Sequence, residues 1–263
     1  MGKIKAVFFD IDGTLVSFKT HRIPPSTLDA VAALRSRGIK VYIATGRPVP
    51  FIDNLGELEY DGMITVTGAH CFTSGGEVIY HQSVSAESVG RVVGHLSHGA
   101  DAYPVIFVCS DEMFITELNE DVDAVARLLD IKMPPVRPAS YACGKDVLQL
   151  ISFFKADREP HFMSALMPDC TSMRWHPFFT DVIAGGVDKS VGIDKVLAYE
   201  GLSLDEAMAF GDGGNDMAML SHVPCGIAMG NACEELKEVA AYVTASVDED
   251  GVARALRHFG LIN

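Results

Sequence analysis

The sequence lacks the long hydrophobic runs and low-complexity tracts that mark membrane proteins and disordered chains. No apolar stretch approaches the roughly 20 residues that span a bilayer. The N-terminal segment MGKIKAVFFD contains no signal-peptide cleavage region, and tracts of Gln, Ser or Pro and internal repeats are absent. We therefore expect a cytoplasmic protein without a membrane partner.

The sequence also lacks the residue spacings of several known sites. The P-loop pattern GxxxxGK[ST] does not occur, and the glycines of GDGGND do not fit GxGxxG, so two kinds of nucleotide site are disfavoured. The cysteines form neither a CxxC pair nor a Cys/His ligand set, and we expect neither zinc nor disulfides. They are Cys71, Cys109, Cys143, Cys170, Cys225 and Cys233.

Positive charge is scarce. Lys and Arg total 21 residues against 35 for Asp and Glu, so the formal net charge is −14. This excess of acids repels nucleic acids and anionic membranes, and we expect neither as a partner. A phosphorylated ligand must therefore meet a local cation.

What is present is an alternation of strands and helices. With 263 residues, the chain has room for one large domain or for two of about 150 residues. Its first and last thirds alternate apolar strands with helices, which is typical of a doubly wound parallel sheet (Rossmann-like α/β fold) covered on both faces. In the first helix, Ser26 is the expected N-cap and Gly38 the expected stop.

The pattern changes in the middle of the chain. Two pairs of neighbouring strands, interspersed with helices, predict an antiparallel or mixed sheet with helices on one face. We therefore expect a core formed by residues 1–84 and 187–263 and an inserted α+β domain formed by residues 85–186.

Polar residues follow several expected strands of the core. Ligands bind at the carboxyl edge of an open parallel sheet, so these residues predict a site. Two carboxylates about 4 Å apart repel by roughly 4 kcal/mol at an effective dielectric constant of about 20, and Mg²⁺ is the natural ion to offset this. Each Asp-Gly stretch alone is more often an ordinary turn. The polar residues are Asp10, Asp12, Thr45, Gly46, Arg47, Asp212, Asn215 and Asp216.

Four motifs resemble, in order and spacing, those of the haloacid-dehalogenase-like (HAD) superfamily of phosphohydrolases: FFDIDGTL, IATGR, GVDKSVGI and FGDGGNDMAML. The tail GIAMGNACEELKEVAAYVTASVDEDGVARAL is similar to the C-terminal signature of the Cof-type, type IIB branch. The resemblance implies a HAD core with an inserted type IIB cap.

The resemblance also implies roles for the two acids of the first motif. Asp10 is expected to be the nucleophile that forms an aspartyl-phosphate, and Asp12 the general acid and then the general base. Dehalogenases and ion-pumping ATPases of the superfamily lack an acid at the position of Asp12. Its presence here therefore favours phosphate esters as substrates.

The remaining motif residues are expected to supply charge. The resemblance implies that an Asp10 oxygen, the Asp12 carbonyl and Asp212 hold Mg²⁺, with Asp216 as an orienting or direct ligand. Lys189 is expected to balance the nucleophile and the phosphoryl oxygens, its alternative being an exposed lysine at a helix start. The other expected phosphate-binding residues are Thr45, Gly46 and Asn215.

Two positions leave alternatives open. Arg47 fits either a phosphate clamp or a structural salt bridge. Thr67, in TVTGAH, stands where the branch usually carries Asn before Gly, which alters the expected substrate contacts but not the chemistry.

Together these features predict a Mg²⁺-dependent phosphatase that hydrolyses a small phosphorylated metabolite, and that is a monomer or a small homo-oligomer. The alternatives are a sugar phosphomutase of the same superfamily and a non-catalytic phosphate-binding regulator, which is expected to lack Asp10 or Asp12. In the inserted domain, Trp175, His176 and Phe178 are candidates for selecting the leaving group, although aromatic stripes more often belong to a core.

Overall fold

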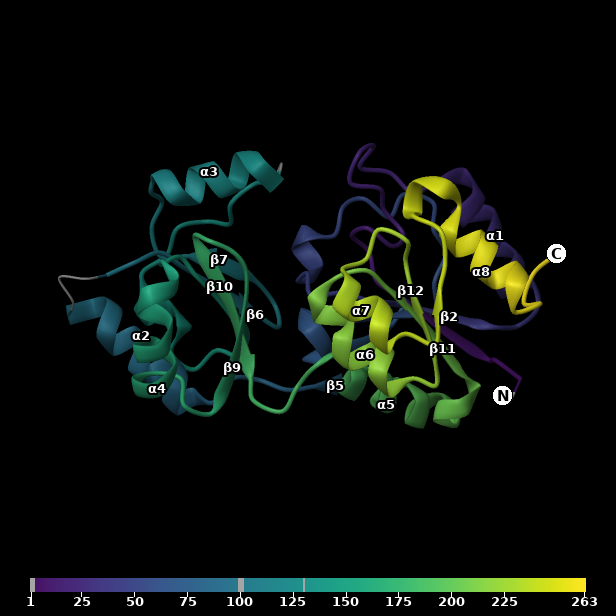
Figure 1. The fold of residues 1–263 in the computed structure, drawn as a ribbon. Helices are drawn as coiled ribbons and strands as arrows, with labels where there is room; N and C mark the ends of the chain where they lie inside the picture. The colour runs from purple at the N-terminus through teal and green to yellow at the C-terminus, as the bar shows by residue number, and fades with distance from the viewer. Residues whose placement is uncertain (1–2, 99–101, 130) are drawn as a thin grey trace. The chain divides into compact units, whose positions relative to one another are not determined.

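The chain divides into two compact units. The computed structural model describes residues 3–98, 102–129 and 131–263 (Figure 1). Residues Met1–His81 and Asp188–Asn263 form the first, which we call the core unit, and Gln82–Val187 form the second, the inserted unit. These limits lie within a few residues of the expected division.

A mixed sheet of eight strands forms the centre of the core unit. The strands are β1 (Ala6–Phe9), β2 (Lys40–Ala44), β3 (Gly62–Thr65), β4 (His70–Thr73), β5 (Val78–His81), β11 (Ala207–Gly211), β12 (Cys225–Ala228) and β13 (Tyr242–Val243). Their order is β13-β12-β11-β1-β2-β3-β4-β5. The pairs from β13 to β3 are parallel, and the hairpin β4–β5 joins β3 in antiparallel fashion.

Helices cover both faces of this sheet, which explains why its central strands β1, β11 and β12 are apolar and buried throughout. On β1, Val7 and Phe9 pack in a cluster with α1 (Pro25–Ser36) and α8 (Gly251–His258). Ala6 and Phe8 point to the opposite cluster, which contains residues of α5 (Lys189–Glu200), α6 (Met217–His222) and α7 (Glu234–Val239). The doubly wound α/β fold is thereby confirmed.

The prediction that Ser26 caps the first helix was wrong. The helix begins at Pro25 after an extended Pro24, and no side chain caps it. Proline is favoured at the first helical position, because its missing N–H is not needed there. The Ser26 hydroxyl instead donates to Asp250 Oδ1 at 2.5 Å, which joins the starts of α1 and α8.

The inserted unit has its own antiparallel sheet and core. Its strands are β6 (Val105–Cys109), β7 (Met113–Ile115), β8 (Val147–Ser152), β9 (Cys170–His176) and β10 (Phe179–Ala184), in the order β7-β6-β8-β10-β9. Its helices are α2 (Ala86–His98), α3 (Glu120–Leu129) and α4 (Glu159–Ala165). Val92 of α2 and Phe162 of α4 share a buried cluster with Phe107 and Leu150 of the sheet.

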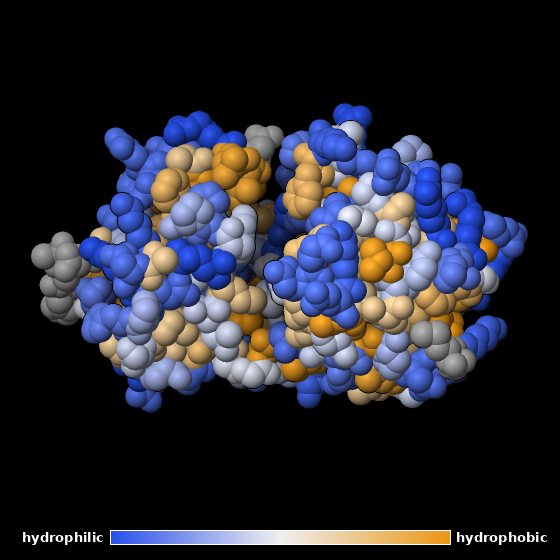
Figure 2. Space-filling model, viewed as in Figure 1, coloured by the Kyte–Doolittle hydropathy of each residue, from blue (hydrophilic) through white to orange (hydrophobic). Residues whose placement is uncertain are grey.

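The face that Figure 2 presents mixes hydrophilic and hydrophobic residues, with the hydrophobic ones dispersed among the hydrophilic ones. Within the described ranges, no helix combines the length and the apolar character that crossing a bilayer requires.

Candidate active site

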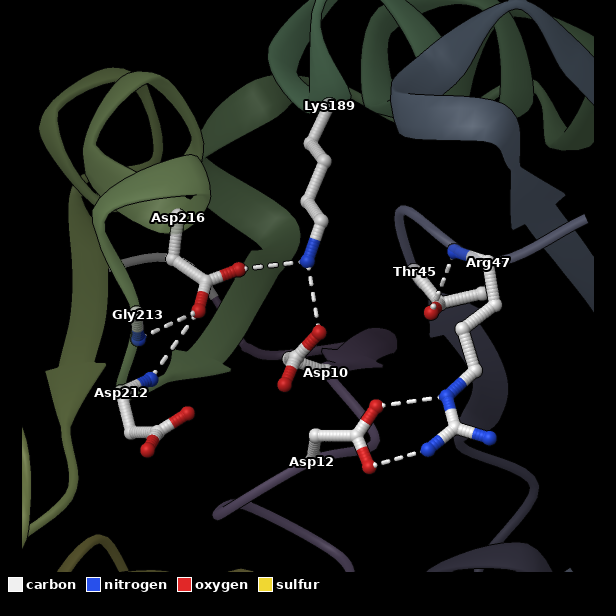
Figure 3. A network of polar contacts seen from close by, with 8 residues as sticks. All are labelled: Asp10, Asp12, Thr45, Arg47, Lys189, Asp212, Gly213 and Asp216. Carbon is white, nitrogen blue, oxygen red and sulfur yellow. Dashed lines mark hydrogen bonds and ion pairs between the residues drawn. The ribbon is translucent and has the colours of Figure 1, made fainter. Parts of the chain in front are cut away.

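The predicted site residues lie at the carboxyl ends of three neighbouring strands. β1 pairs in parallel with β11 on one side and β2 on the other, so the segments that follow these strands emerge side by side. Asp10 follows β1, Thr45 and Arg47 follow β2, and Asp212 follows β11. Figure 3 shows these side chains converging together with Lys189 from the start of α5.

Lys189 joins two of the acids. Its Nζ donates to Asp10 Oδ1 and to Asp216 Oδ1, each at 2.6 Å, and the lysine is completely buried. Asp188 caps α5 by accepting hydrogen bonds from the backbone N–H groups of Ser190 and Val191, which fixes the helix start that carries the lysine. Lys189 is therefore not an exposed lysine at a helix end.

The acids carry more negative charge than the lysine balances. Burial and the Asp216 carboxylate raise the pKa of Asp10 well above its usual range, against the opposing effect of Lys189. Burial and Asp216 also raise the pKa of Asp212 to about 7. Although burial lowers the pKa of Lys189, the charges of Asp10 and Asp216 outweigh it and raise the pKa overall. This corner of the sheet therefore attracts a further cation.

Asp216 holds the loop that carries Asp212. Its Oδ2 accepts hydrogen bonds from the backbone N–H groups of Asp212 and Gly213, both at 3.0 Å, while its Oδ1 accepts from Lys189 (Figure 3). Asp216 is completely buried. Both of its oxygens thus have partners within the protein.

Asp12 forms a two-pronged ion pair with Arg47. Arg47 Nε donates to Asp12 Oδ2 and Nη2 to Asp12 Oδ1, both at 2.7 Å (Figure 3). Its Nη1 donates to the Phe51 carbonyl at 2.8 Å. Of the two interpretations of Arg47, this geometry matches the salt bridge. The arginine fixes the rotamer of Asp12 and joins it to the segment that follows β2.

The expected phosphate-binding groups lie together around Gly46. A Cβ atom added to Gly46 would lie 3.3 Å from the Thr67 hydroxyl oxygen and 3.5 Å from Asn215 Nδ2. Thr67 is buried and has a positive φ of 52°, a conformation that is uncommon for a residue other than glycine. Its hydroxyl thus lies next to the predicted phosphate-binding groups.

The sequence interpretation missed Asn231 as a site residue. This side chain follows β12 and donates hydrogen bonds to the Gly13 carbonyl at 2.9 Å and to Asp212 Oδ2 at 3.0 Å. The only sequence signal was its place in the Cof-type tail, within GIAMGNACEELK.

Three of the acids have the arrangement of a metal site. Asp10, Asp212 and Asp216 each offer a carboxylate oxygen, and these oxygens lie within 4.8 Å of one another. Hard oxygen ligands suit Mg²⁺, and burial together with the neighbouring Asp216 carboxylate raises the pKa of Asp10 and of Asp212, which a bound cation would offset. The residues present therefore fit a divalent cation.

Comparison with known proteins agrees with this geometry. Residues 7–256 match the family model of the haloacid dehalogenase-like hydrolases. The Bacillus subtilis (strain 168) protein YkrA is 36% identical over 262 residues, with 98% of each chain covered. The 5-amino-6-(5-phospho-D-ribitylamino)uracil phosphatase YitU of the same organism is 28% identical, with 96% of each chain covered.

Solved structures show the same fold across nearly the whole chain. The HAD subclass IIB sugar phosphatase BT4131 is 43% identical with a TM-score of 0.88, and the match covers 98% of this chain and 100% of that chain. The phosphatase BT1666 of Bacteroides thetaiotaomicron is 36% identical with a TM-score of 0.89, and the match covers 99% of this chain and 96% of that one. The chain thus belongs to the haloacid dehalogenase-like hydrolases, in their Cof-type, subclass IIB branch, and is a phosphoric monoester hydrolase.

Proposed function

We propose that the chain is a Mg²⁺-dependent phosphatase that hydrolyses a small phosphorylated metabolite, such as a sugar phosphate, through an aspartyl-phosphate on Asp10. The observation that carries this proposal is the environment of Asp10. One carboxylate oxygen accepts from Lys189, and no hydrogen bond to the other is found among the described residues (Figure 3). Asp10 is thus a fixed carboxylate with an oxygen free to attack.

The first step transfers the phosphoryl group to Asp10. A carboxylate oxygen forms a bond to phosphorus while the bond from phosphorus to the ester oxygen breaks. Asp12, when it carries a proton, donates it to the departing ester oxygen, which leaves as an alcohol. Because both Asp12 oxygens accept from Arg47 in this conformation, the pair must loosen at one oxygen for this transfer.

The second step returns the enzyme to its starting state. A water attacks phosphorus, and Asp12 accepts a proton from it. The bond between phosphorus and the Asp10 oxygen breaks, which releases phosphate and restores the carboxylate. Splitting one difficult displacement into two easier ones is the advantage of a covalent nucleophile.

The surrounding residues supply positive charge and hydrogen-bond donors. Lys189 offsets the charge of Asp10, and Thr45, the Gly46 N–H and Asn215 bind phosphoryl oxygens. Asp10, the Asp12 carbonyl and Asp212 would hold Mg²⁺, which neutralises charge on the phosphoryl group when bound. Because the oxygens of Asp216 are engaged by Lys189 and two backbone N–H groups, we assign Asp216 an orienting role.

The inserted unit is proposed to act as a cap that selects the leaving group. Trp175 on β9 is 60% exposed, although large apolar side chains are usually buried. The relatives of this chain point to the substrate class: BT4131 is a sugar phosphatase, and YitU acts on a phosphorylated ribitylamino compound. Both compounds are small and hydroxylated, which supports a substrate of that type.

Neither alternative has support of its own. A phosphomutase needs a phosphorylated activator and returns the phosphoryl group to a sugar, and none of the relatives named above is a mutase. A non-catalytic regulator is expected to lack the nucleophile or the acid, yet Asp10 and Asp12 are both present.

The decisive experiment is a screen of phosphate monoesters with Mg²⁺ that follows release of inorganic phosphate. We expect release from sugar phosphates without a bisphosphate activator, and its loss when Mg²⁺ is removed. The Asp10→Asn variant keeps the shape of the side chain but cannot attack phosphorus, so it should fold and lose turnover by several orders of magnitude. Wild-type turnover in that variant would refute the assignment of the nucleophile.

A further inference from the structure

Asn231 connects three segments of the core unit through one side-chain amide. Its Nδ2 donates to the Gly13 carbonyl, in the loop after Asp12, and to Asp212 Oδ2, after β11. Its Oδ1 accepts a hydrogen bond from the backbone N–H of Val247 at 2.9 Å. Asn231 is exposed, so these contacts, rather than packing, hold its amide in place.

The partners determine which way the amide points. The Gly13 carbonyl and the ionised Asp212 carboxylate, which only accept, face one end of the amide, and the Val247 N–H, which only donates, faces the other. A flipped amide would place three acceptors together and leave the Val247 N–H unpaired. In the observed orientation, the two hydrogens of Nδ2 match two acceptors, so no donor of this amide remains for a phosphate.

Gly13 encloses the same oxygen of Asp212 from another side. Its φ of +80° disfavours a side chain, and a Cβ atom added there would lie 2.0 Å from Asp212 Oδ2. Oδ2 is thus held between Gly13 and the amide of Asn231. No hydrogen bond to Oδ1 of Asp212 is found in the part of the chain that the structure describes. The two oxygens of this carboxylate are therefore not equivalent.

The position of Asn231 is itself fixed by the C-terminal segment. Val247 begins a short 3-10 helix, Val247–Glu249, whose start is closed by reciprocal hydrogen bonds between Ser246 and Glu249. The next residue, Asp248, accepts from the Ser17 hydroxyl at 2.6 Å and so holds the loop that follows the nucleophile. Asn231 therefore has little freedom to move with a displaced Asp212.

We propose that Asn231 is a positioning residue that leaves Asp212 only one oxygen for the metal and thereby favours Mg²⁺ over Ca²⁺. Mg²⁺ requires a compact octahedral shell and takes few carboxylate oxygens, whereas Ca²⁺ accepts six to eight ligands and often both oxygens of one carboxylate. Occupying Oδ2 removes the second oxygen that Ca²⁺ would use. This inference rests on the proposed Mg²⁺ site and adds the source of its selectivity.

The test measures metal binding by thermal unfolding, without any substrate. Melting temperatures of the full chain are recorded while MgCl₂ or CaCl₂ is titrated. In Asn231→Ala we expect the half-saturating Mg²⁺ concentration to rise about 10- to 100-fold, as is typical when a residue behind a metal ligand is lost. The Ca²⁺ value should change much less, because Oδ2 becomes available to that ion. Asn231→Ser is a second variant with a smaller loss of hydrogen bonding, should the alanine variant fail to fold.

Ser246→Ala is the matched control. It removes the hydroxyl that donates to Glu249 Oε2 at 2.8 Å but leaves the Asn231 amide intact. It should lower the metal-free melting temperature without changing the ratio of Mg²⁺ to Ca²⁺ affinity. Equal shifts for both ions in Asn231→Ala, or none, would overturn the inference alone. A wild-type protein that neither ion stabilises would overturn the proposed Mg²⁺ site as well.

Discussion

At the scale of single residues, Lys189 has the most demanding environment in the candidate site. Its ammonium group lies with no exposure between the carboxylates of Asp10 and Asp216. Desolvating each of these ions costs several kcal/mol, and their mutual attraction offsets that cost only while all partners are present. The lysine thus has a structural role besides the one proposed for it in catalysis.

We predict that Lys189→Met lowers the free energy of unfolding by about 3–5 kcal/mol, because it leaves two buried carboxylates without their cation. Urea denaturation at neutral pH measures this. Lys195→Met is the matched control: Lys195 is an exposed lysine of the same helix whose ammonium lies 5.0 Å from the centre of the Tyr80 ring, and its loss should change stability by no more than about 1 kcal/mol. Equal stability of the two variants would contradict a buried ion-pair network at Lys189.

The sequence pointed to acids and a lysine that the structure brings together, but not to all of their partners. Asp10 and Asp212 each follow an apolar strand, and strand ends are where a parallel sheet gathers polar groups. The pairing of Arg47 with Asp12 was left open, and that of Asn231 with Asp212 was missed. Each joins segments from different strand ends, so it depends on side-chain rotamers in the folded unit, which no local pattern specifies.

At the scale of secondary-structure elements, the strand pair β9–β10 carries an unusual carboxyl group. Asp181 lies on β10, and its Oδ2 accepts from the indole N–H of Trp175 at 2.9 Å. Burial raises the pKa of Asp181 to about 7, and the indole hydrogen bond only partly opposes this. The folded protein therefore favours the protonated form of this side chain over a wider range of pH than the unfolded chain does.

This pKa predicts a pH dependence of stability. An unfolded Asp has a pKa of about 3.9, so between about pH 4 and pH 7 the folded state binds a proton that the unfolded state does not. The contribution of Asp181 is then complete below about pH 4 and is lost as the pH rises through 7. A single proton limits the slope to about 1.4 kcal/mol per pH unit, and the partial exposure of Asp181 makes it smaller than this limit.

The Asp181→Asn variant should remove this slope. Urea denaturation at several pH values between about 5 and 8 compares it with the wild type and with Asp123→Asn, an exposed aspartate of the same unit. We expect the stability of Asp181→Asn relative to the wild type to increase with pH. If all three proteins lose stability in parallel, Asp181 does not titrate in this range.

The same strand pair contains two aromatic residues, Trp175 and Phe179, that allow the proposed selection of the leaving group to be tested. Trp175 is 60% exposed and Phe179 only 3%, although their rings lie edge to face at 4.8 Å. Trp175→Ala should change the ratio of kcat/KM for large and small phosphate esters by an amount equivalent to about 1–3 kcal/mol. Phe179→Ala should instead cost about 3–5 kcal/mol of stability and leave the ranking of substrates unchanged. Uniform loss of activity in both variants, with lowered melting temperatures, would reject a role for Trp175 in selection.

Secondary-structure elements were easiest to predict from the sequence where a strand is buried on both faces of the sheet, because such a strand is a continuous run of apolar residues. β1 is such a run, because Ala6 and Val7 face two different helical layers. The strand β4 has no such run, since His70–Thr73 is short and becomes a strand through its pairing with β3 and β5. The start of α1 was predicted too late, because the conformational preference of Pro25 outweighs the capping preference of Ser26.

At the scale of the whole molecule, the division into two units follows from where the apolar residues gather. The core unit has two clusters, one on each face of its sheet, and the inserted unit has a separate one. The change from alternating strands and helices to paired strands made this division visible in the sequence. An insertion with its own buried cluster has what a domain needs to fold independently.

We therefore predict that residues 82–187, expressed alone, fold in a single cooperative transition. Their sheet is completed within the unit, and the backbone N–H of Val84 donates to the Val147 carbonyl at 2.8 Å, which anchors the entering chain. Circular dichroism during heating and dispersion of amide proton shifts measure folding. Phe107→Ala in this fragment should lower the melting temperature strongly, because it removes a fully buried ring from the cluster.

The complementary protein, in which a short Gly-Ser linker replaces residues 82–187, should retain stabilisation by Mg²⁺ and release phosphate from small esters, but distinguish poorly between leaving groups. A fragment without a cooperative transition would mean that the inserted unit depends on the core unit for its fold.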